Sequence, residues 1–289
     1  MNRPIIVALI VIVALTAGVY AYIQRKDAPQ HGGNTDQSHR SYSMEITRET
    51  PSKVPGQPVS FTYTIKNDQG EVLKDFETVH EKKMHFIVVR EDLQNFQHLH
   101  PEFNQNSGEW TVDVTFPTDG PYRVFPDFTP AKSAGNPQLL PVTVNSKVEV
   151  GDMSKYNAQA ATLDTQSKKT FGEYQVTHTL ATNLTKEQEV TYILTIERNG
   201  KAVIDLQQYL GALGHSVILK EGTLDFIHTH AGEPGMQGMD HGSTMGSASK
   251  TGPNVEFTTT FPESGVYKIF TQFQHQNKII TIDYTVNID

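Results

Sequence analysis

Six histidines fall into two groups of three with the same internal spacing, and they are the first candidates for chemistry in this 289-residue chain. They are His85, His98 and His100 in the first group and His215, His228 and His230 in the second. In both groups the second and third members follow the first by 13 and 15 residues. Imidazole nitrogens are common ligands of Zn(II) and Cu(II). The repeated spacing therefore predicts two metal-binding triads, each holding one divalent ion.

Each group lies on a pattern that is typical of a β-hairpin. An apolar run starts at the first histidine (HFIVVR and HSVILK), a polar turn follows (EDLQ and EGTL), and a second run ends in His-x-His (NFQHLH and DFIHTH). Antiparallel pairing about the turn places His85 opposite His100 and His215 opposite His230. Because strand residues two apart share a face, we expect the three imidazoles of each group on one face of their hairpin.

The two hairpins differ at most positions but agree at the histidines. Between residues 85–100 and 215–230, five of sixteen positions are identical, and three of these are the histidines. An idle cluster of surface histidines is the alternative explanation. Because most other positions of the hairpins have changed while the histidines have not, the comparison favours metal binding by at least one triad.

Candidates for a fourth ligand are fewer. Asp127 of the first copy aligns with Gln272 of the second, so a carboxylate ligand from the later strand is expected in the first copy alone. His80 and His275 have no counterparts in the other copy. We expect these two histidines to be ordinary surface residues.

Short alternating runs separated by turns continue through the chain after residue 43, without a long stretch of helical period. Such runs are typical of strands in an antiparallel sandwich. The pattern also occurs twice, since residues 58–65 match 189–196 and residues 116–128 match 261–273 without a gap. We therefore predict an all-β chain of two tandem immunoglobulin-like antiparallel β-sandwich repeats behind an N-terminal transmembrane helix.

That helix is predicted from residues 4–23, a run of twenty residues without a charge, which is long enough to cross a bilayer. An uncleaved anchor places the protein in the cell membrane as a single-pass protein with its C-terminal domains on the extracytoplasmic side. A cleaved signal peptide, and hence a secreted protein, is the alternative. The predicted organisation is an anchor or signal peptide at 1–26, a flexible stalk at 27–43, repeat one at 44–150, a linker at 151–169 and repeat two at 170–289.

Repeat two carries an insertion at 232–252 that has no equivalent in repeat one. It contains Met236, Met239, His241 and Met245, separated by Gly, Ser and Asp. Thioether sulfur is a soft ligand that suits Cu(I). Because a Gly- and Ser-rich loop offers no core for methionine, we predict a second metal-binding element here, with flexible filler as the alternative. Together with the triads, the loop favours copper, and zinc is the second candidate.

Composition excludes several classes of protein. The chain has 24 Lys+Arg against 32 Asp+Glu, a net charge of −8, and no basic cluster, which argues against a nucleic-acid partner. It has no cysteine, which excludes disulfide scaffolds, thiol nucleophiles, iron–sulfur clusters and blue-copper centres. Any metal must therefore be held by His, Met, Asp or Glu.

The histidine hairpins, the Phe-Pro-x-x-Gly-x-Tyr turns at 116–122 and 261–267, and the Met/His loop resemble extracytoplasmic immunoglobulin-like copper-handling domains, the CopC-like and FixH/YtkA-like group. The resemblance covers roughly residues 44–289. It implies a sandwich fold and a role in copper resistance or delivery. CopC-like proteins place a copper-binding histidine at the mature N-terminus, where this chain has its predicted anchor and stalk, so their site is not carried over.

These observations favour a membrane-tethered extracytoplasmic copper-binding protein, a chaperone or a resistance protein, that exchanges metal with a donor or acceptor protein and is not an enzyme. A zinc-dependent hydrolytic enzyme with a His₃ site is a second hypothesis, although the sequence has no His-Glu-x-x-His pattern. A structural or adhesive sandwich module without metal is a third.

Overall fold

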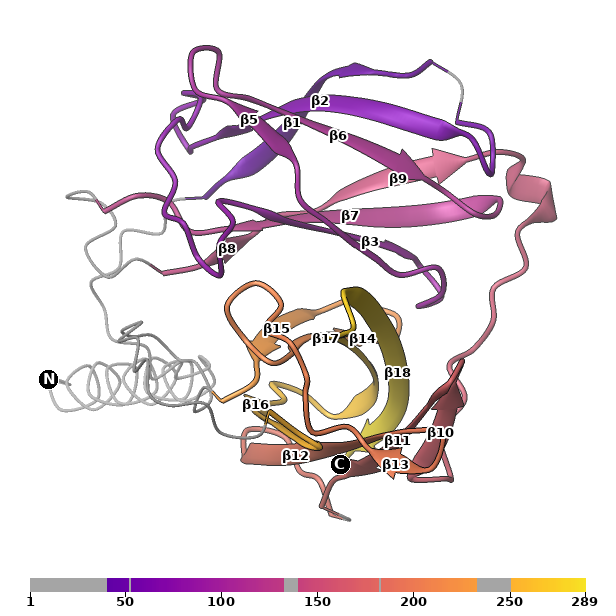
Figure 1. The fold of residues 1–289 in the computed structure, drawn as a ribbon. Helices are drawn as coiled ribbons and strands as arrows, with labels where there is room; N and C mark the ends of the chain where they lie inside the picture. The colour runs from indigo at the N-terminus through magenta and orange to yellow at the C-terminus, as the bar shows by residue number, and fades with distance from the viewer. Residues whose placement is uncertain (1–40, 52, 133–139, 182, 233–250) are drawn as a thin grey trace, which may run out of the picture. The chain divides into compact units, whose positions relative to one another are not determined.

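Strands make up almost all of the regular structure in the residues that the computed structural model describes, which are 41–289 apart from 52, 133–139, 182 and 233–250 (Figure 1). The predicted all-β class and the two repeated domains are confirmed. The predicted anchor, most of the stalk and the Met/His loop lie outside the described residues. Among the described residues, no helix has the length and apolarity that crossing a membrane requires.

Repeat one forms two antiparallel sheets, ordered β1-β2-β6-β5 and β4-β3-β7-β8, with β9 also paired to β7. The strands are β1 (Ser43–Glu49), β2 (Pro58–Lys66), β3 (His85–Arg90), β4 (Gln97–Leu99), β5 (Glu102–Asn104), β6 (Glu109–Thr115), β7 (Gly120–Phe128), β8 (Val142–Thr143) and β9 (Ser146–Val150). A short 3-10 helix, η1 (Met153–Lys155), follows them.

Repeat two also has two antiparallel sheets, ordered β10-β11-β12-β13 and β15-β14-β17-β18, with β16 also paired to β12. The strands are β10 (Lys168–Phe171), β11 (Tyr174–Thr179), β12 (Glu189–Arg198), β13 (Lys201–Ala202), β14 (His215–Lys220), β15 (Phe226–His230), β16 (Asn254–Thr260), β17 (Gly265–His275) and β18 (Lys278–Ile288).

Alternating apolar residues build a core between the two sheets of each repeat. On β6, Trp110, Val112 and Val114 are buried while the residues between them are exposed, as period-two patterning requires. These side chains belong to the apolar core of repeat one, and β16 contributes Val255 and Phe257 to the core of repeat two in the same way. Each repeat is therefore a β-sandwich-like domain with its own core.

The repeated Phe-Pro-x-x-Gly-x-Tyr turn closes each sandwich. The hydroxyl of Tyr122 donates to the carbonyl of Thr118 at 3.1 Å, and that of Tyr267 donates to the carbonyl of Glu263 at 2.9 Å. The glycine of the motif in repeat one, Gly120, has a φ of +135°, a conformation that residues with a Cβ rarely adopt. The motif therefore recurs because a buried tyrosine ties each turn to the following strand.

Strands β3 and β14 are buried on both faces, apart from their last residue. One face supplies the core of its own repeat, and the other packs against the opposite repeat. This contact contains Ile87, Val89, Leu93, Phe125, Val217, Leu219, Leu224 and Phe270. Residues 40–289 accordingly form one compact unit, in which the two central sheets face each other (Figure 1).

Two stacked pairs of phenylalanines show that the contact is nearly symmetric. Phe96 stacks on Phe270 with ring centroids 4.4 Å apart, and Phe226 stacks on Phe125 at 5.4 Å. Phe96 and Phe226 are equivalent in the two copies, and so are Phe125 and Phe270. The repeats therefore associate as an isologous dimer does, with a pseudo-twofold axis between them.

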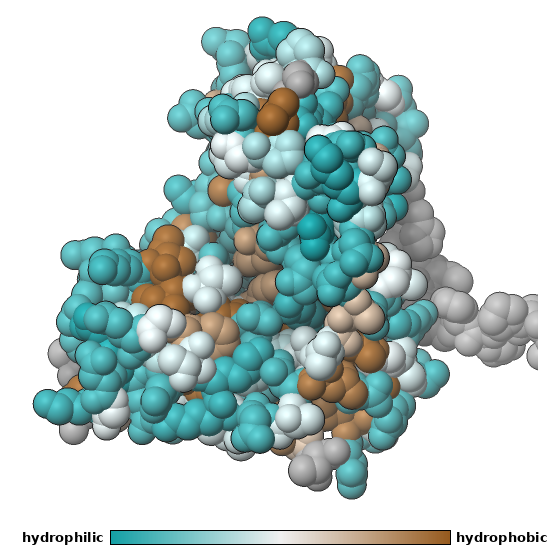
Figure 2. All heavy atoms as spheres, turned by 90° about the vertical axis from the view of Figure 1, so that its right-hand side faces the viewer, coloured by the Kyte–Doolittle hydropathy of each residue, from teal (hydrophilic) through white to brown (hydrophobic). Residues whose placement is uncertain are grey.

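Outside this contact the surface is polar. Hydrophilic residues cover most of the face drawn in Figure 2, and hydrophobic residues appear there in small separate groups. Strong exposure is seen for only a few large apolar side chains of the described residues, among them Ile279 at 50%. Apart from the two cores, the apolar residues thus lie mainly in the contact between the repeats.

Removing one ring from the contact tests its contribution. We expect Phe270→Ala to lower the free energy of unfolding by about 3 kcal/mol, because it leaves a cavity at a side chain that is 5% exposed. Urea denaturation followed by tryptophan fluorescence measures the change. The matched control Ile279→Ala removes an exposed side chain and should change stability by less than about 0.5 kcal/mol. Equal effects in the two variants would contradict the packing described.

Candidate metal centre

The histidine hairpins have the register that the spacing predicts. In β3 and β4, Ile87 pairs with His98, and in β14 and β15, His215 pairs with His230. Each triad therefore lies on one face of its hairpin, the face that also carries Ile87 and Val217. Since those two residues belong to the contact between the repeats, the imidazoles of both triads face the opposite repeat.

The first triad converges as a metal site requires. His85, His98 and His100 each offer one ring nitrogen within 4.8 Å of the other two. Nδ1 of His85 lies 2.9 Å from Nε2 of His98, a contact that one proton bridges in the metal-free chain. Ligand nitrogens around a tetrahedral Zn(II) ion are separated by about 3.4 Å. A metal could therefore replace that proton with little movement of the rings.

The second group of converging nitrogens differs from the predicted triad. It contains His80, His215 and His230, again with ligand atoms within 4.8 Å of one another. The ring of His80 stacks on that of His230 with centroids 3.5 Å apart and lies 5.3 Å from that of His215. His80 comes from repeat one, so this group is shared between the repeats.

The expectation that His80 and His275 are ordinary surface residues is wrong. His80 packs against two imidazoles of the other repeat. His275 is only 4% exposed, because it ends β17 beneath the β11 strand, where its Nδ1 lies 2.8 Å from the hydroxyl of Tyr174 and its Nε2 lies 3.2 Å from Asp205. Comparison of the copies could not find either role, since neither histidine has a counterpart.

A tight turn before β3 positions His80. Val79 and Lys82 exchange backbone hydrogen bonds of 2.8 and 3.1 Å, and the two residues between them have positive φ, 49° at His80 and 65° at Glu81. This is the geometry of a type I′ turn, which favours glycine or asparagine. The equivalent turn of repeat two has a glycine, Gly211, where repeat one has Glu81. Repeat one therefore holds His80 in place with a strained backbone.

Backbone carbonyls of these two turns orient the first histidine of each triad. Nε2 of His215 donates to the carbonyl of Tyr209 at 2.8 Å, and Nε2 of His85 lies 3.4 Å from the equivalent carbonyl of Val79. Because Nε2 of His215 donates, its Nδ1 keeps its lone pair, as in metal-binding histidines. Nδ1 of His215 is buried and makes no hydrogen bond to any residue that the structure describes.

Two further hydrogen bonds cross between the repeats. Nδ1 of His98 donates to Oε1 of Gln272 at 2.9 Å, and Nδ1 of His228 lies 2.8 Å from Oδ2 of Asp127. Asp127 is the residue from which a fourth ligand was expected in the first copy, and Gln272 is the residue aligned with it in the second. Each instead orients the middle histidine of the opposite repeat, an arrangement that aligning the copies one by one cannot reveal.

His228 occupies the space between the two groups. Its ring centroid lies 4.6 Å from that of His230 and 5.1 Å from that of His85. It is absent from both groups of three, although the sequence predicts it as a ligand. The predicted ligands Met236, Met239, His241 and Met245 lie outside the described residues, and their role stays a prediction.

Burial keeps the imidazoles neutral. It lowers the pKa of His85 and His98 well below the ordinary value, with further lowering from neighbouring imidazoles, and it lowers the pKa of His100 to about 4. The pKa of His215 is also lowered, first by burial and then by His230. Burial raises the pKa of Asp127. Neutral imidazoles have the free lone pairs that metal binding needs.

These pKa shifts predict acid sensitivity of the metal-free chain. Below the ordinary histidine pKa of 6.5 the unfolded chain gains protons that folded His100 accepts only near its pKa of about 4, so stability should fall as the pH drops through this window. Urea midpoints between pH 7.5 and 4, measured after removal of metal with a chelator, test this. The His100→Gln variant should lose less stability than the wild type across the window, and parallel curves would contradict the assignment.

The strained turn generates a second prediction. Glu81→Gly should raise the free energy of unfolding by about 0.5–1 kcal/mol, since glycine adopts a positive φ without strain. The reverse comparison, Gly211→Ala, should lower it by about 1 kcal/mol. Thermal or urea unfolding of both variants measures these changes. A loss of stability in Glu81→Gly would show that the backbone at this turn is not strained.

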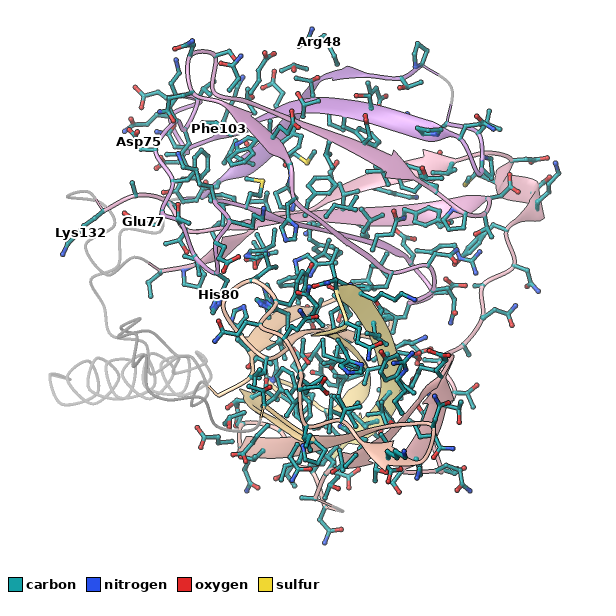
Figure 3. The ribbon with its side chains drawn as sticks, in the orientation of Figure 1. Arg48, Asp75, Glu77, His80, Phe103 and Lys132 are labelled. Carbon is teal, nitrogen blue, oxygen red and sulfur yellow. The ribbon has the colours of Figure 1, made fainter. Side chains whose placement is uncertain are left out.

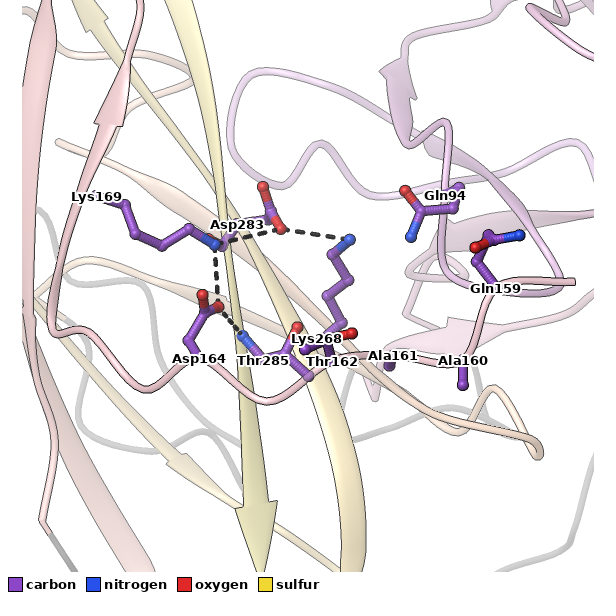
Figure 4. A pocket seen from close by; sticks show the side chains of 10 residues that line it. All are labelled: Gln94, Gln159, Ala160, Ala161, Thr162, Asp164, Lys169, Lys268, Asp283 and Thr285. Atoms are coloured by element: carbon purple, nitrogen blue, oxygen red, sulfur yellow. Dashed lines mark hydrogen bonds and ion pairs between the residues drawn. The ribbon is translucent and has the colours of Figure 1, made fainter.

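A polar cavity of about 350 Å³ lies apart from the histidines, where linker residues pass β17 and β18 (Figure 4). Its charges are paired: Nζ of Lys169 lies 2.9 Å from Asp164, and Nζ of Lys268 lies 3.3 Å from Asp283. Since the two lysines balance the two aspartates, the cavity has no net charge that would attract an ionic ligand. The cavity is therefore a weaker candidate than the imidazole groups.

Solved structures that resemble this chain include several distant ones. A Corynebacterium diphtheriae protein described as membrane anchored matches 86% of this chain and 57% of its own, with 9% identity and a TM-score of 0.23. Red sea bream transglutaminase matches 89% and 32%, with 10% identity and a TM-score of 0.25. MtrC from Shewanella baltica matches 86% and 69%, with 8% identity and a TM-score of 0.27. The chain thus spans less than two thirds of the first two proteins, and scores this low carry no functional argument.

Comparison with curated proteins gives no match. A family model does match, that of a domain of unknown function, DUF8832, over residues 37–158 and again over residues 168–289. The two matches cover most of the chain, and each contains one histidine hairpin. The chain therefore belongs to the DUF8832 family and carries two copies of its domain.

Proposed function

We propose that this chain is a membrane-tethered extracytoplasmic copper-binding protein that acts in copper delivery or copper resistance. The observation that carries the proposal is the gathering of imidazoles at the contact between the repeats. They belong to His80, His85, His98, His100, His215, His228 and His230. Metal binding explains why so many nitrogen donors lie together in a buried place.

The surroundings of the imidazoles support a metal rather than a structural role. Polar groups are costly to bury unless they have partners, and Nε2 of His100 and Nδ1 of His215 are buried without a hydrogen bond to any described residue. His98 is oriented by Gln272 and His215 by a backbone carbonyl, the kind of outer contact that fixes the ring of a metal ligand. A purely structural cluster would not leave buried nitrogens without a hydrogen bond.

The donor set supports copper over zinc. Among divalent first-row metals, Cu(II) binds nitrogen ligands more tightly than Zn(II) does. The insertion that starts shortly after His230 adds three methionines and His241, which suit Cu(I). We propose that the histidine groups hold a divalent ion and that the loop accepts Cu(I) and exchanges it with a donor or acceptor protein.

The resemblance to CopC-like and FixH/YtkA-like domains supports the same proposal. In repeat one the sheet orders β1-β2-β6-β5 and β4-β3-β7-β9 correspond to strands ABED and C′CFG of an immunoglobulin-like sandwich. We accordingly propose an immunoglobulin-like fold for both repeats. We also propose that residues 1–26 tether them to the membrane.

Copper titration of the purified full chain tests the function. We expect tight binding of Cu(II), weaker binding of Zn(II), and a loss of affinity of about tenfold or more in His98→Gln, because that change removes a ligand of the first triad. Competition with a chromophoric chelator measures each affinity.

His178→Gln is the matched control, since His178 is another buried histidine but stacks on Tyr284, away from the centre. It should bind copper as the wild type does, and circular dichroism checks that both variants fold. If the wild type binds neither metal, the chain is a structural module and the proposal is wrong. Tighter binding of Zn(II) than of Cu(II) would favour the zinc-enzyme hypothesis instead.

A further inference from the structure

We propose that His80 of repeat one forms a composite metal site with His215 and His230 of repeat two, separate from the triad His85, His98 and His100, and that a metal ion bound there joins the two repeats. This inference rests on the proposed metal-binding function and adds a ligand and a structural consequence to it.

Geometry is the first support. The three ligand nitrogens lie within 4.8 Å of one another, as those of the first triad do. His215 and His230 are 1% and 7% exposed, so their donor atoms face the interior of the contact rather than solvent. Figure 3 shows His80 at the edge of repeat one that is next to repeat two. The site is therefore closed by a residue from across the contact.

The backbone that carries His80 is the second support. His80 and Glu81 are consecutive residues other than glycine at positive φ, whereas the equivalent turn has Leu210 and Gly211. Strained backbone persists where the surrounding structure or a function holds it. The same turn also brings the carbonyl of Val79 toward His85 of the first triad. One turn thus serves both metal sites.

The departure from symmetry at this turn makes the two sites unequal. The position equivalent to His80 is Leu210, so repeat two contributes no imidazole from its turn. Repeat one supplies every ligand of the first triad, whereas the composite site exists only while the repeats are docked. A ligand that binds only the docked state stabilises it. Metal in the composite site should therefore strengthen the contact.

The decisive variant is His80→Leu in the full chain, because leucine is the residue that repeat two has at this position. Equilibrium dialysis against Zn(II) keeps the three methionines of the Met/His loop out of the count, because thioethers bind Zn(II) poorly. We expect the wild type to hold two equivalents, His80→Leu to hold one, and His80→Leu combined with His98→Gln to hold none. The rise in Tm on adding Zn(II) should shrink in His80→Leu.

The metal-free Tm of each variant, compared with the wild type, shows whether it folds. His178→Gln removes a buried histidine that stacks on Tyr284 away from the site, and as the matched control it should hold two equivalents. If His80→Leu retains both equivalents while His98→Gln loses one, the composite site is wrong and the metal-binding function stands. If the wild type holds no metal ion, neither Cu(II) nor Zn(II), the proposed function itself is wrong.

Discussion

Strands β3 and β14 have two apolar faces, and the rest of the structure depends on covering both. One face of each strand completes the core of its own sandwich. The other would expose residues such as Val89 and Leu219 to water unless a second apolar surface covered it. The opposite repeat provides that surface. Because the first histidine of each triad begins the same strand, on the same face, covering the apolar residues also brings the imidazoles together.

The contact between the repeats has an apolar part that is nearly symmetric and a polar part that is not. The two stacked phenylalanine pairs follow the pseudo-twofold relation, since each pair only buries apolar surface. Departures from symmetry occur among the imidazoles: Asp127 aligns with Gln272, and His80 aligns with Leu210. A carboxylate and an amide orient different histidines, and only one turn contributes a ring. Duplication thus supplied a symmetric scaffold on which two unequal sites could form.

Burial of several neutral imidazoles links the chemistry of the centre to the stability of the protein. Removing water lowers the histidine pKa values, so the rings are unprotonated at neutral pH and ready to bind a cation. The same burial makes the fold sensitive to acid, since the unfolded chain gains protons more readily. A metal ion bound as proposed would offset this sensitivity, because it also favours the neutral rings. Burial of the imidazoles is therefore the common cause of their neutral state and of the expected loss of stability in acid.

The sequence by itself determined the all-β class, the internal repeat and the hairpin register that places His85, His98 and His100 on one face. These features follow from local pairing and from the two-residue period of a strand, which a single sequence displays. Tertiary structure alone decided that the two triad faces meet, that Asp127 serves His228 of the other repeat, and that a strained turn delivers His80. These contacts join residues about 100 or more positions apart, and neither periodicity nor the alignment of one copy on the other encodes which surfaces dock.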